Sequence, residues 1–147
     1  METNDALVER LIKRRANALF ALSIAFIVIQ GRFIETAPHV SSPGSLKIAA
    51  WVVMAIILLF FFATGGGWTR SRAVRALMND ESTRLHRARA TTIAFYNMMA
   101  TGVIVYGLGM IKPVTGGQAV HLVMTVGIAS ALMAFAGWER AALRAAQ

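Results

Sequence analysis

The chain alternates between long apolar stretches and short polar segments. Four apolar stretches cover residues 16–36, 46–64, 89–111 and 119–138, and charged residues are nearly absent from their interiors. The hydrocarbon core of a bilayer is about 30 Å thick, so a helix needs roughly 20 residues to cross it. Each stretch is close to that length, and a chain of 147 residues is too small to bury all of them in water. We therefore predict an all-α membrane protein, a four-transmembrane-helix bundle forming a single domain of residues 1–147.

The polar segments predict how these spans are connected. Residues 1–15 place Leu7, Leu11 and Ile12 on one face among charged residues, which predicts an amphipathic N-terminal helix lying along the inner membrane surface. Residues 65–88 begin with three glycines and predict a cytoplasmic helical connection, and residues 139–147 predict a short cytoplasmic tail. Residues 112–117 predict a tight turn, so the third and fourth spans should be antiparallel neighbours.

The distribution of positive charge predicts the orientation. The chain has 15 Lys and Arg against 7 Asp and Glu, a net charge of +8. Twelve of the 15 lie in the N-terminal segment, the middle connection and the C-terminal tail, and three lie in the other two connections. Cytoplasmic segments of membrane proteins carry the excess of Lys and Arg. We therefore expect both termini and residues 65–88 to be cytoplasmic in a bacterial inner membrane, where the cations attract anionic lipids. Direct nucleic-acid binding is the weaker interpretation of this charge.

Composition restricts the available chemistry. The chain has no cysteine, which excludes disulfides, thiolate metal sites and thiol catalysis. His39, His86 and His121 lie at the ends of the predicted spans, whereas a membrane haem usually takes its histidines from within them. We accordingly predict no cofactor, no metal and no catalytic residue.

The most distinctive polar segment precedes the third predicted span. Asp80 and Glu81 lie at a predicted helix start, where carboxylates complement the helix dipole, and both are spaced to pair with Arg84. Such pairing leaves later arginines available for phosphates or acidic groups. The predicted surface for docking a protein or lipid head groups comprises Arg72, Arg75, Asp80, Glu81, Arg84, Arg87 and Arg89. A capped helix end with snorkelling arginines explains the same pattern structurally.

Residues 80–90 also carry a resemblance to known proteins. The segment joins an Asp-Glu pair, an arginine shortly after it and a basic, alanine-containing approach to the third span. It resembles a segment of small, uncharacterised four-helix proteins of the bacterial inner membrane. Some of those proteins are encoded beside DNA-binding regulators, so the resemblance implies a cytoplasmic regulatory protein as a partner.

A polar group lies inside the third predicted span. Asn97 is near its middle, with Tyr96 beside it and Thr92 and Thr101 about one turn away. An amide in hydrocarbon is costly without a hydrogen-bond partner. We expect these side chains either to make an interhelical hydrogen bond or to line a ligand pocket.

A second polar group is predicted on the outer side of the membrane. It consists of Arg32, Glu35, His39 and His121, and the three-residue spacing of Arg32 and Glu35 allows them to pair on one helix face. Two imidazoles and a carboxylate are suitable transition-metal ligands, but their spacing in the sequence is wide. We therefore predict no metal site here.

Small residues predict where the third and fourth spans touch, because helices in lipid associate through close backbone approach. The candidates are Ala94, Thr101, Gly102, Gly107 and Gly109 in one span and Gly127, Ser130, Ala131, Ala134 and Gly137 in the other.

Three functions are compatible with this pattern. The favoured one is a non-enzymatic, self-associating membrane protein that presents its basic cytoplasmic face to a protein partner or to anionic lipid. The second is a small dimeric transporter or channel, because four short helices enclose little volume alone. Proton-coupled efflux proteins of this size carry a carboxylate within the first span, whereas here the first carboxylate is Glu35 at its outer end. The third is an interfacial enzyme acting on lipids or quinones, for which no catalytic spacing is present.

Overall fold

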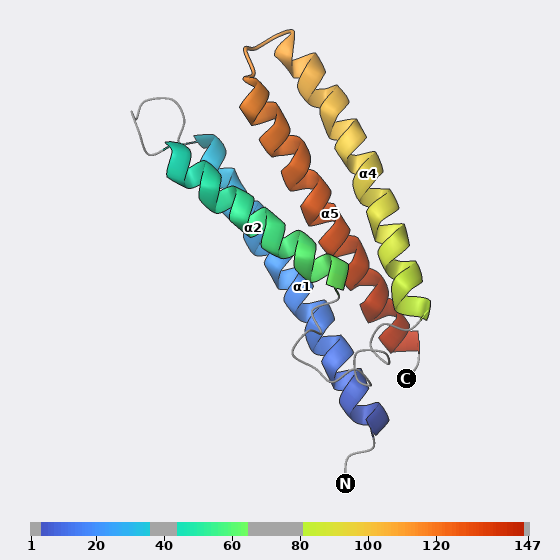
Figure 1. Cartoon of the computed structure of the whole chain (residues 1–147). Coiled ribbons are helices and arrows are strands. Elements are labelled where there is room, and N and C mark those ends of the chain that lie inside the picture. The colour runs from blue at the N-terminus through green and yellow to red at the C-terminus, as the bar shows by residue number, and fades with distance from the viewer. Residues whose placement is uncertain (1–3, 36–43, 65–80, 146–147) are drawn as a thin grey trace.

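The fold was obtained as a computed structural model, which describes the backbone of residues 4–35, 44–64 and 81–145. Within these residues the chain is entirely helical, which confirms the predicted fold class at that level. The helices are α1 (Asn4–Glu35), α2 (Gly44–Thr64), α4 (Glu81–Gly109) and α5 (Gly116–Ala145), labelled as in Figure 1.

Helix α1 joins two elements that the sequence predicts separately. Its 32 residues, Asn4–Glu35, contain both the amphipathic N-terminal segment and most of the first predicted span. The sequence predicts a change of direction near residue 15, but the helix continues through it. The absence of Gly and Pro between residues 4 and 30 explains this continuity, because nothing there interrupts the backbone hydrogen bonds.

Helices α4 and α5 form the predicted antiparallel hairpin (Figure 1). Helix α4 has 29 residues, about 44 Å at 1.5 Å per residue, and ends at Gly109. The turn is closed by Lys112 N–H donating to the Leu108 carbonyl at 2.8 Å. Helix α5 then starts with a capping box, in which Gln118 N–H donates to Thr115 Oγ1 at 3.3 Å and Thr115 N–H to Gln118 Oε1 at 3.0 Å.

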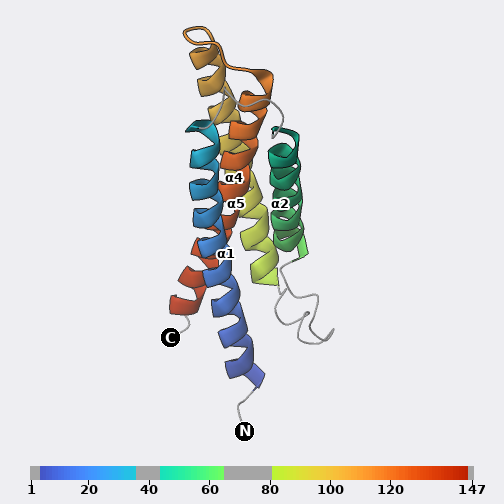
Figure 2. The same ribbon diagram turned by 90° about the vertical axis from the view of Figure 1, so that its left-hand side faces the viewer.

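Helix α5 is the centre of the bundle. Helices α1 and α4 pack extensively along it, whereas α2 makes fewer contacts and reaches mainly α5. Figures 1 and 2 show the N-terminal end of α1 and the C-terminal end of α5 at the same end of the bundle. We call this the basic end, because the exposed cations described below lie there.

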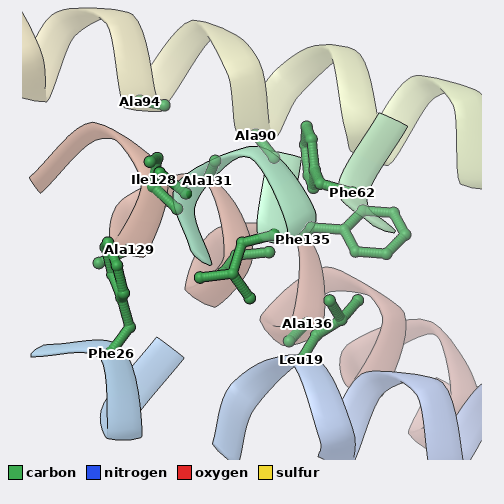
Figure 3. Packing of buried hydrophobic residues seen from close by; sticks show 13 residues of the cluster. Leu19, Phe26, Phe62, Ala90, Ala94, Ile128, Ala129, Ala131, Phe135 and Ala136 are labelled. Carbon is green, nitrogen blue, oxygen red and sulfur yellow. The ribbon is translucent and has the colours of Figure 1, made fainter. Parts of the chain in front are cut away.

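The seam between α1 and α5 follows a regular repeat of three and four residues. On α1 the buried seam positions are Ala16, Leu19, Ser23, Phe26 and Gln30, and on α5 they are Thr125, Ala129, Leu132, Ala136 and Glu139. This spacing produces knobs-into-holes packing between helices that cross at a small angle. The side chains therefore meet in layers, and Figure 3 shows two of them, Leu19 with Ala136 and Phe26 with Ala129.

The hydrophobic core lies around Phe135, which is 1% exposed. Phe62 of α2 packs edge-on against it, with ring centroids 5.7 Å apart and an interplanar angle of 86°. Helix α4 approaches through small side chains, and Figure 3 shows Ala90 and Ala94 directed toward α5. The Phe62 and Phe135 rings and the small side chains of Ala90 and Ala94 thus fill the space in which α2, α4 and α5 meet.

Small residues explain part of the α4–α5 contact. Gly127 is buried, and a Cβ at this position would lie 2.4 Å from Cγ and Sδ of Met98. Ala94 and Ala131 are buried as well. In contrast, a Cβ at Gly107 or Gly137 would meet open space. The predicted contact is therefore confirmed at Ala94, Gly127 and Ala131 and is wrong at Gly107 and Gly137, and also at Gly102 and Gly109, where a Cβ would likewise meet open space.

Two helices, α4 and α5, have the length and apolar composition needed to cross a membrane. The apolar part of α2 among the described residues, Ile48–Thr64, is shorter. Length and composition alone also fit the core helix of a water-soluble protein. The four-span arrangement therefore stays a prediction, which the exposed surface of the bundle supports below.

Candidate functional site

A buried ion pair joins α1 and α5 at the basic end. Arg15 Nη2 donates to Glu139 Oε2 at 2.5 Å, and the side chains are only 4% and 3% exposed. The guanidinium also lies over the Phe135 ring, with Cζ 5.3 Å from the centroid. Two charges removed from water in this way need further hydrogen bonds to offset their desolvation.

Helix α4 supplies those hydrogen bonds. Thr83, 3% exposed, donates its hydroxyl to Glu139 Oε1 at 3.1 Å and accepts from Arg15 Nη2 at 3.5 Å. His86 Nδ1 lies 3.5 Å from Glu139 Oε1, and its ring stacks on Trp138 at 6.3 Å between centroids. The Glu139 carboxylate thus contacts side chains of α1 and α4 and connects these two helices to α5. We call Arg15, Thr83, His86 and Glu139 the clamp.

Arg87 extends the clamp to α2. Its Nη1 donates to the Ala63 carbonyl at 2.8 Å, next to the C-terminal end of that helix, where the carbonyls lack helical partners. Partial burial, and to a lesser degree the nearby Arg15 charge, lower the pKa of Arg87. The sequence predicts Arg87 as an arginine available for phosphates. In the structure, Arg87 instead donates a hydrogen bond to a carbonyl at the C-terminal end of α2.

Arg140 makes a second connection between α1 and α5. Its Nε and Nη2 donate to Asn17 Oδ1 at 3.1 and 2.9 Å. Its Cζ also lies 4.3 Å from the centroid of the Phe20 ring, a cation–π distance. Arg140 is therefore held within the bundle, although the sequence predicts it only as part of a cytoplasmic tail.

Other cations at the basic end point into solvent. The exposed ones that make no hydrogen bond or ion pair with any described residue are Lys13, Arg14, Arg84, Arg89 and Arg144. They come from α1, α4 and α5, the same three helices that the clamp connects. The clamp consequently fixes the positions of the helices that carry these charges.

The predicted docking surface is described only in part. Glu81, Arg84 and Arg89 are exposed, and the pairing of Glu81 with Arg84 does not occur in the structure. Arg72, Arg75 and Asp80 lie outside the described residues. Of the predicted arginines, Arg84 and Arg89 are exposed at the basic end. The exposed cations there also include Lys13 and Arg14 of α1 and Arg144 of α5, which were not part of the predicted surface.

The polar residues predicted inside the third span face away from the bundle. Asn97 and Thr92 are exposed, and Tyr96 is 66% exposed. Thr92 donates to the Ala88 carbonyl at 3.1 Å, and Thr101 donates to the Asn97 carbonyl at 2.7 Å. These hydroxyls are satisfied within α4. The Asn97 amide makes no hydrogen bond with another described residue, so the structure contains no interhelical bond from this amide within the described part of the chain.

Of the polar group predicted on the outer side, the structure describes only the His121 side chain. His121 packs on Trp51 of α2, with ring centroids 4.8 Å apart and planes inclined by 39°. The side chains of Arg32 and Glu35, and His39 as a whole, lie outside the described residues. Among the residues that are described, no three His, Asp or Glu side chains are grouped as metal ligands would be.

The clamp was not predicted from the sequence. Arg15 reads as one of several cations before the first span, and Glu139 as the start of a polar tail. The available signal is that Glu139 is the only acidic residue after Glu81 and directly follows the fourth apolar stretch. An acid at the end of an apolar span needs a cation, but its partner is 124 residues away in the sequence.

The clamp is suited to positioning helices, because its contacts connect α1, α4 and α5. Both oxygens of the Glu139 carboxylate accept hydrogen bonds, Oε1 from Thr83 and Oε2 from Arg15. The chain matches no protein-family model, no curated protein and no solved structure.

Proposed function

We propose that this protein is a four-span membrane protein of the bacterial inner membrane and acts as a non-enzymatic interaction module. Its basic end faces the cytoplasm and binds anionic groups, supplied by acidic lipids or by a cytoplasmic regulatory protein. The observation that carries the proposal is the set of five exposed cations, Lys13, Arg14, Arg84, Arg89 and Arg144, on helices joined by a buried clamp.

The apolar surface of the bundle supports the membrane location. Every helix exposes large aliphatic side chains: Val28 of α1 is 59% exposed, Ile56 of α2 59%, Val103 of α4 71% and Val120 of α5 60%. Water-soluble proteins rarely expose contiguous apolar patches beyond about 300–600 Å². A belt of such side chains on all four helices is typical of a surface that contacts lipid.

The position of the charges supports the orientation and the binding role. The five cations lie at one end of the bundle, whereas Lys112 is in the turn at the other end. Each Lys or Arg close to an anionic membrane surface contributes about 1 kcal/mol to binding. Cations held in place by the clamp also lose less freedom on binding than cations on a mobile segment would.

The test compares charge reversal at the two ends of the molecule. Arg84→Glu with Arg89→Glu should weaken the binding of added phosphatidylglycerol, measured by native mass spectrometry, by at least about 30-fold, since about 2 kcal/mol is lost. In cells, cross-linking of the same variant should also recover less of any cytoplasmic partner. Lys112→Glu is the matched control and should leave both readouts unchanged.

The two arms separate the two sources of anionic groups. Loss of lipid binding alone would identify the basic end as a lipid-binding surface, and loss of cross-linked protein alone would identify a protein partner. Unchanged results in both arms after reversal of Arg84 and Arg89 would contradict the proposed function.

A second proposal, self-association, is favoured by the outward face of α4. The Asn97 amide is exposed eight residues after residue 89, where the third predicted span begins, about 12 Å into the bilayer core. An amide in hydrocarbon needs a partner, and two amides related by a twofold axis can each donate and accept. A dimer formed in this way would also provide the second copy that a small transporter or channel requires.

Self-association can be tested by replacing the amide with an apolar group of similar size. Asn97→Leu should lower the dimer fraction in lipid, measured by single-molecule photobleaching, whereas Thr92→Val on the same helix should not. Interhelical hydrogen bonds in membranes contribute about 0.6–2 kcal/mol, so a change of about 3- to 30-fold in the dimerisation constant is expected. An unchanged constant would exclude this face as the interface.

A further inference from the structure

A second group of buried polar side chains lies at the opposite end of the bundle from the clamp. Gln30 is 3% exposed, yet neither its amide nitrogen nor its amide oxygen has a hydrogen-bond partner. The Thr125 hydroxyl and the Trp51 indole N–H are also buried without a partner. These three residues come from α1, α5 and α2, respectively.

The packing register places Gln30 and Thr125 in one layer. In the α1–α5 seam, Leu19 meets Ala136 and Phe26 meets Ala129, so each step forward on α1 matches an equal step back on α5 (Figure 3). Four residues beyond Phe26 is Gln30, and four residues before Ala129 is Thr125. Both are seam positions of the three-four repeat, and both side chains point into the bundle.

The conformation of Thr125 distinguishes it from the other hydroxyl side chains of these helices. Thr91, Thr92 and Thr101 each donate to the carbonyl four residues earlier, and Ser130 does the same on α5. That bond is the easiest way for a hydroxyl to be satisfied within a membrane helix. The Thr125 hydroxyl does not make it. Its proton is therefore available to a group outside α5.

Trp51 and His121 form an aromatic wall next to this layer. Their ring centroids are 4.8 Å apart, and His121 precedes Thr125 by one helical turn, about 6 Å along the axis. Trp51 lies on α2 and His121 on α5, and α2 packs on α5 but has little contact with α1 among the described residues. Gln30 and Thr125 are only 3% and 7% exposed, so a head group would enter this layer by separating α1 from α2, which have little contact among the described residues.

Leaving these atoms unpaired is costly. A buried polar group without a partner costs about 1–3 kcal/mol, and the cost increases in a medium of low dielectric. Gln30 and Thr125 share this condition within one layer and Trp51 shares it beside that layer, whereas the hydroxyls of Thr91, Thr92, Thr101 and Ser130 are satisfied. A common partner that accepts from the Gln30 amide NH₂, the Thr125 hydroxyl and the Trp51 indole N–H would remove most of this cost and leave only the Gln30 amide oxygen without a donor.

We propose that Gln30, Thr125 and Trp51 form a binding site for a planar, uncharged, carbonyl-bearing head group of the quinone type. The amide NH₂, the hydroxyl and the indole N–H are all donors, so they select a ligand rich in acceptors. None of the three is ionisable, which favours an uncharged ligand in hydrocarbon. The Trp51–His121 wall provides a surface on which a flat ring can stack. This site is separate from the basic end; it rests on the proposed membrane location but not on the binding of anionic groups at the basic end.

The proposal concerns binding and includes no redox step. The test uses decylubiquinone as the probe and purified full-length protein in lipid nanodiscs. Wild-type protein should show a midpoint of thermal unfolding that rises with decylubiquinone concentration, because a ligand that binds only the folded state stabilises it. Gln30→Leu combined with Thr125→Val should abolish that rise.

The variants also make a prediction without the probe. Because both substitutions replace unpaired polar atoms by apolar groups of similar size, the double variant should unfold at the same temperature as wild type or higher. Ser23→Ala is the matched control, since Ser23 lies in the same seam but its hydroxyl is satisfied by the Phe20 carbonyl at 2.8 Å. This variant should keep the full response to decylubiquinone.

A second readout covers the case in which the double variant does not fold. In a Trp68→Phe, Trp138→Phe background, Trp51 is the only tryptophan, and decylubiquinone should quench its fluorescence saturably in the presence of Thr125 and less in Thr125→Val. The proposal is overturned by equal responses of wild type and variants to the probe, or by no response of wild type. A loss of stability in the double variant without the probe would also overturn it, because the side chains would then already be satisfied by ordered water.

Discussion

Removing one member of the clamp provides the sharpest test of how the bundle is held together. Arg15→Met keeps the length and the apolar stem of the side chain but leaves Glu139, 3% exposed, without its cation. Thr83 and His86 can still contact the carboxylate, so one of its oxygens retains its partners. The other oxygen, which accepts from Arg15 at 2.5 Å, would lose its partner.

The expected loss follows from the burial of the pair. Removing one partner of a buried ion pair costs about 3–5 kcal/mol, mostly because the remaining charge is left uncompensated. Arg14→Met is the matched control, since Arg14 is the neighbouring residue, is exposed and makes no ion pair with a described residue. Its effect should be within about 0.5 kcal/mol.

The measurement is the free energy of unfolding in detergent micelles, followed by circular dichroism in a denaturant titration. A double-mutant cycle adds Glu139→Leu and the combination with Arg15→Met. The combined variant should recover much of the lost stability, because replacing both charges by apolar side chains of similar volume is often close to neutral. If Arg15→Met and Arg14→Met are equally stable, the clamp does not hold the helices and the reasoning is refuted.

Three further substitutions test the packing. Gly127→Ala should destabilise the bundle by about 1–3 kcal/mol, because its Cβ would lie 2.4 Å from two atoms of Met98. In the same denaturant titration, Gly137→Ala should cause no loss of unfolding free energy, because its Cβ would meet open space. Thr83→Val removes a hydroxyl that donates to the buried carboxylate at 3.1 Å and should cost about 1–3 kcal/mol, and an unchanged midpoint would show that the hydroxyl is dispensable. Phe135→Ala deletes a ring that is 1% exposed and should cost about 3–5 kcal/mol; a loss below 1 kcal/mol would place Phe135 outside the core.

The helices and the hairpin could be predicted from the sequence because their causes are local. Apolar stretches of nearly constant length determine the helices, and the short segment after Gly109 requires α4 and α5 to be antiparallel neighbours. The continuity of α1 was harder to predict. A cluster of cations before an apolar run suggests a boundary, but charge alone does not interrupt a helix.

The polar sites could not be predicted to the same extent, because they depend on which helix faces lie against one another. Arg15 and Glu139 belong to segments that each look like a solvated helix end, and only the α1–α5 seam brings them together. Asn97 shows the opposite case, a residue that is expected inside the bundle but is exposed. The sequence places it in the middle of a span, where an interior partner is expected, but the packing of α4 on α5 through Ala90 and Ala94 turns it outward.

The central claim is that the bundle lies in the membrane with its basic end in the cytoplasm and the turn between α4 and α5 outside. Because the chain has no native cysteine, single cysteines at positions 14, 84 and 112 can be labelled in intact cells with a membrane-impermeant maleimide. The account predicts labelling at position 112 alone, with positions 14 and 84 reacting only after the cells are opened. Labelling of position 14 or 84 from outside, or protection of position 112, would contradict it.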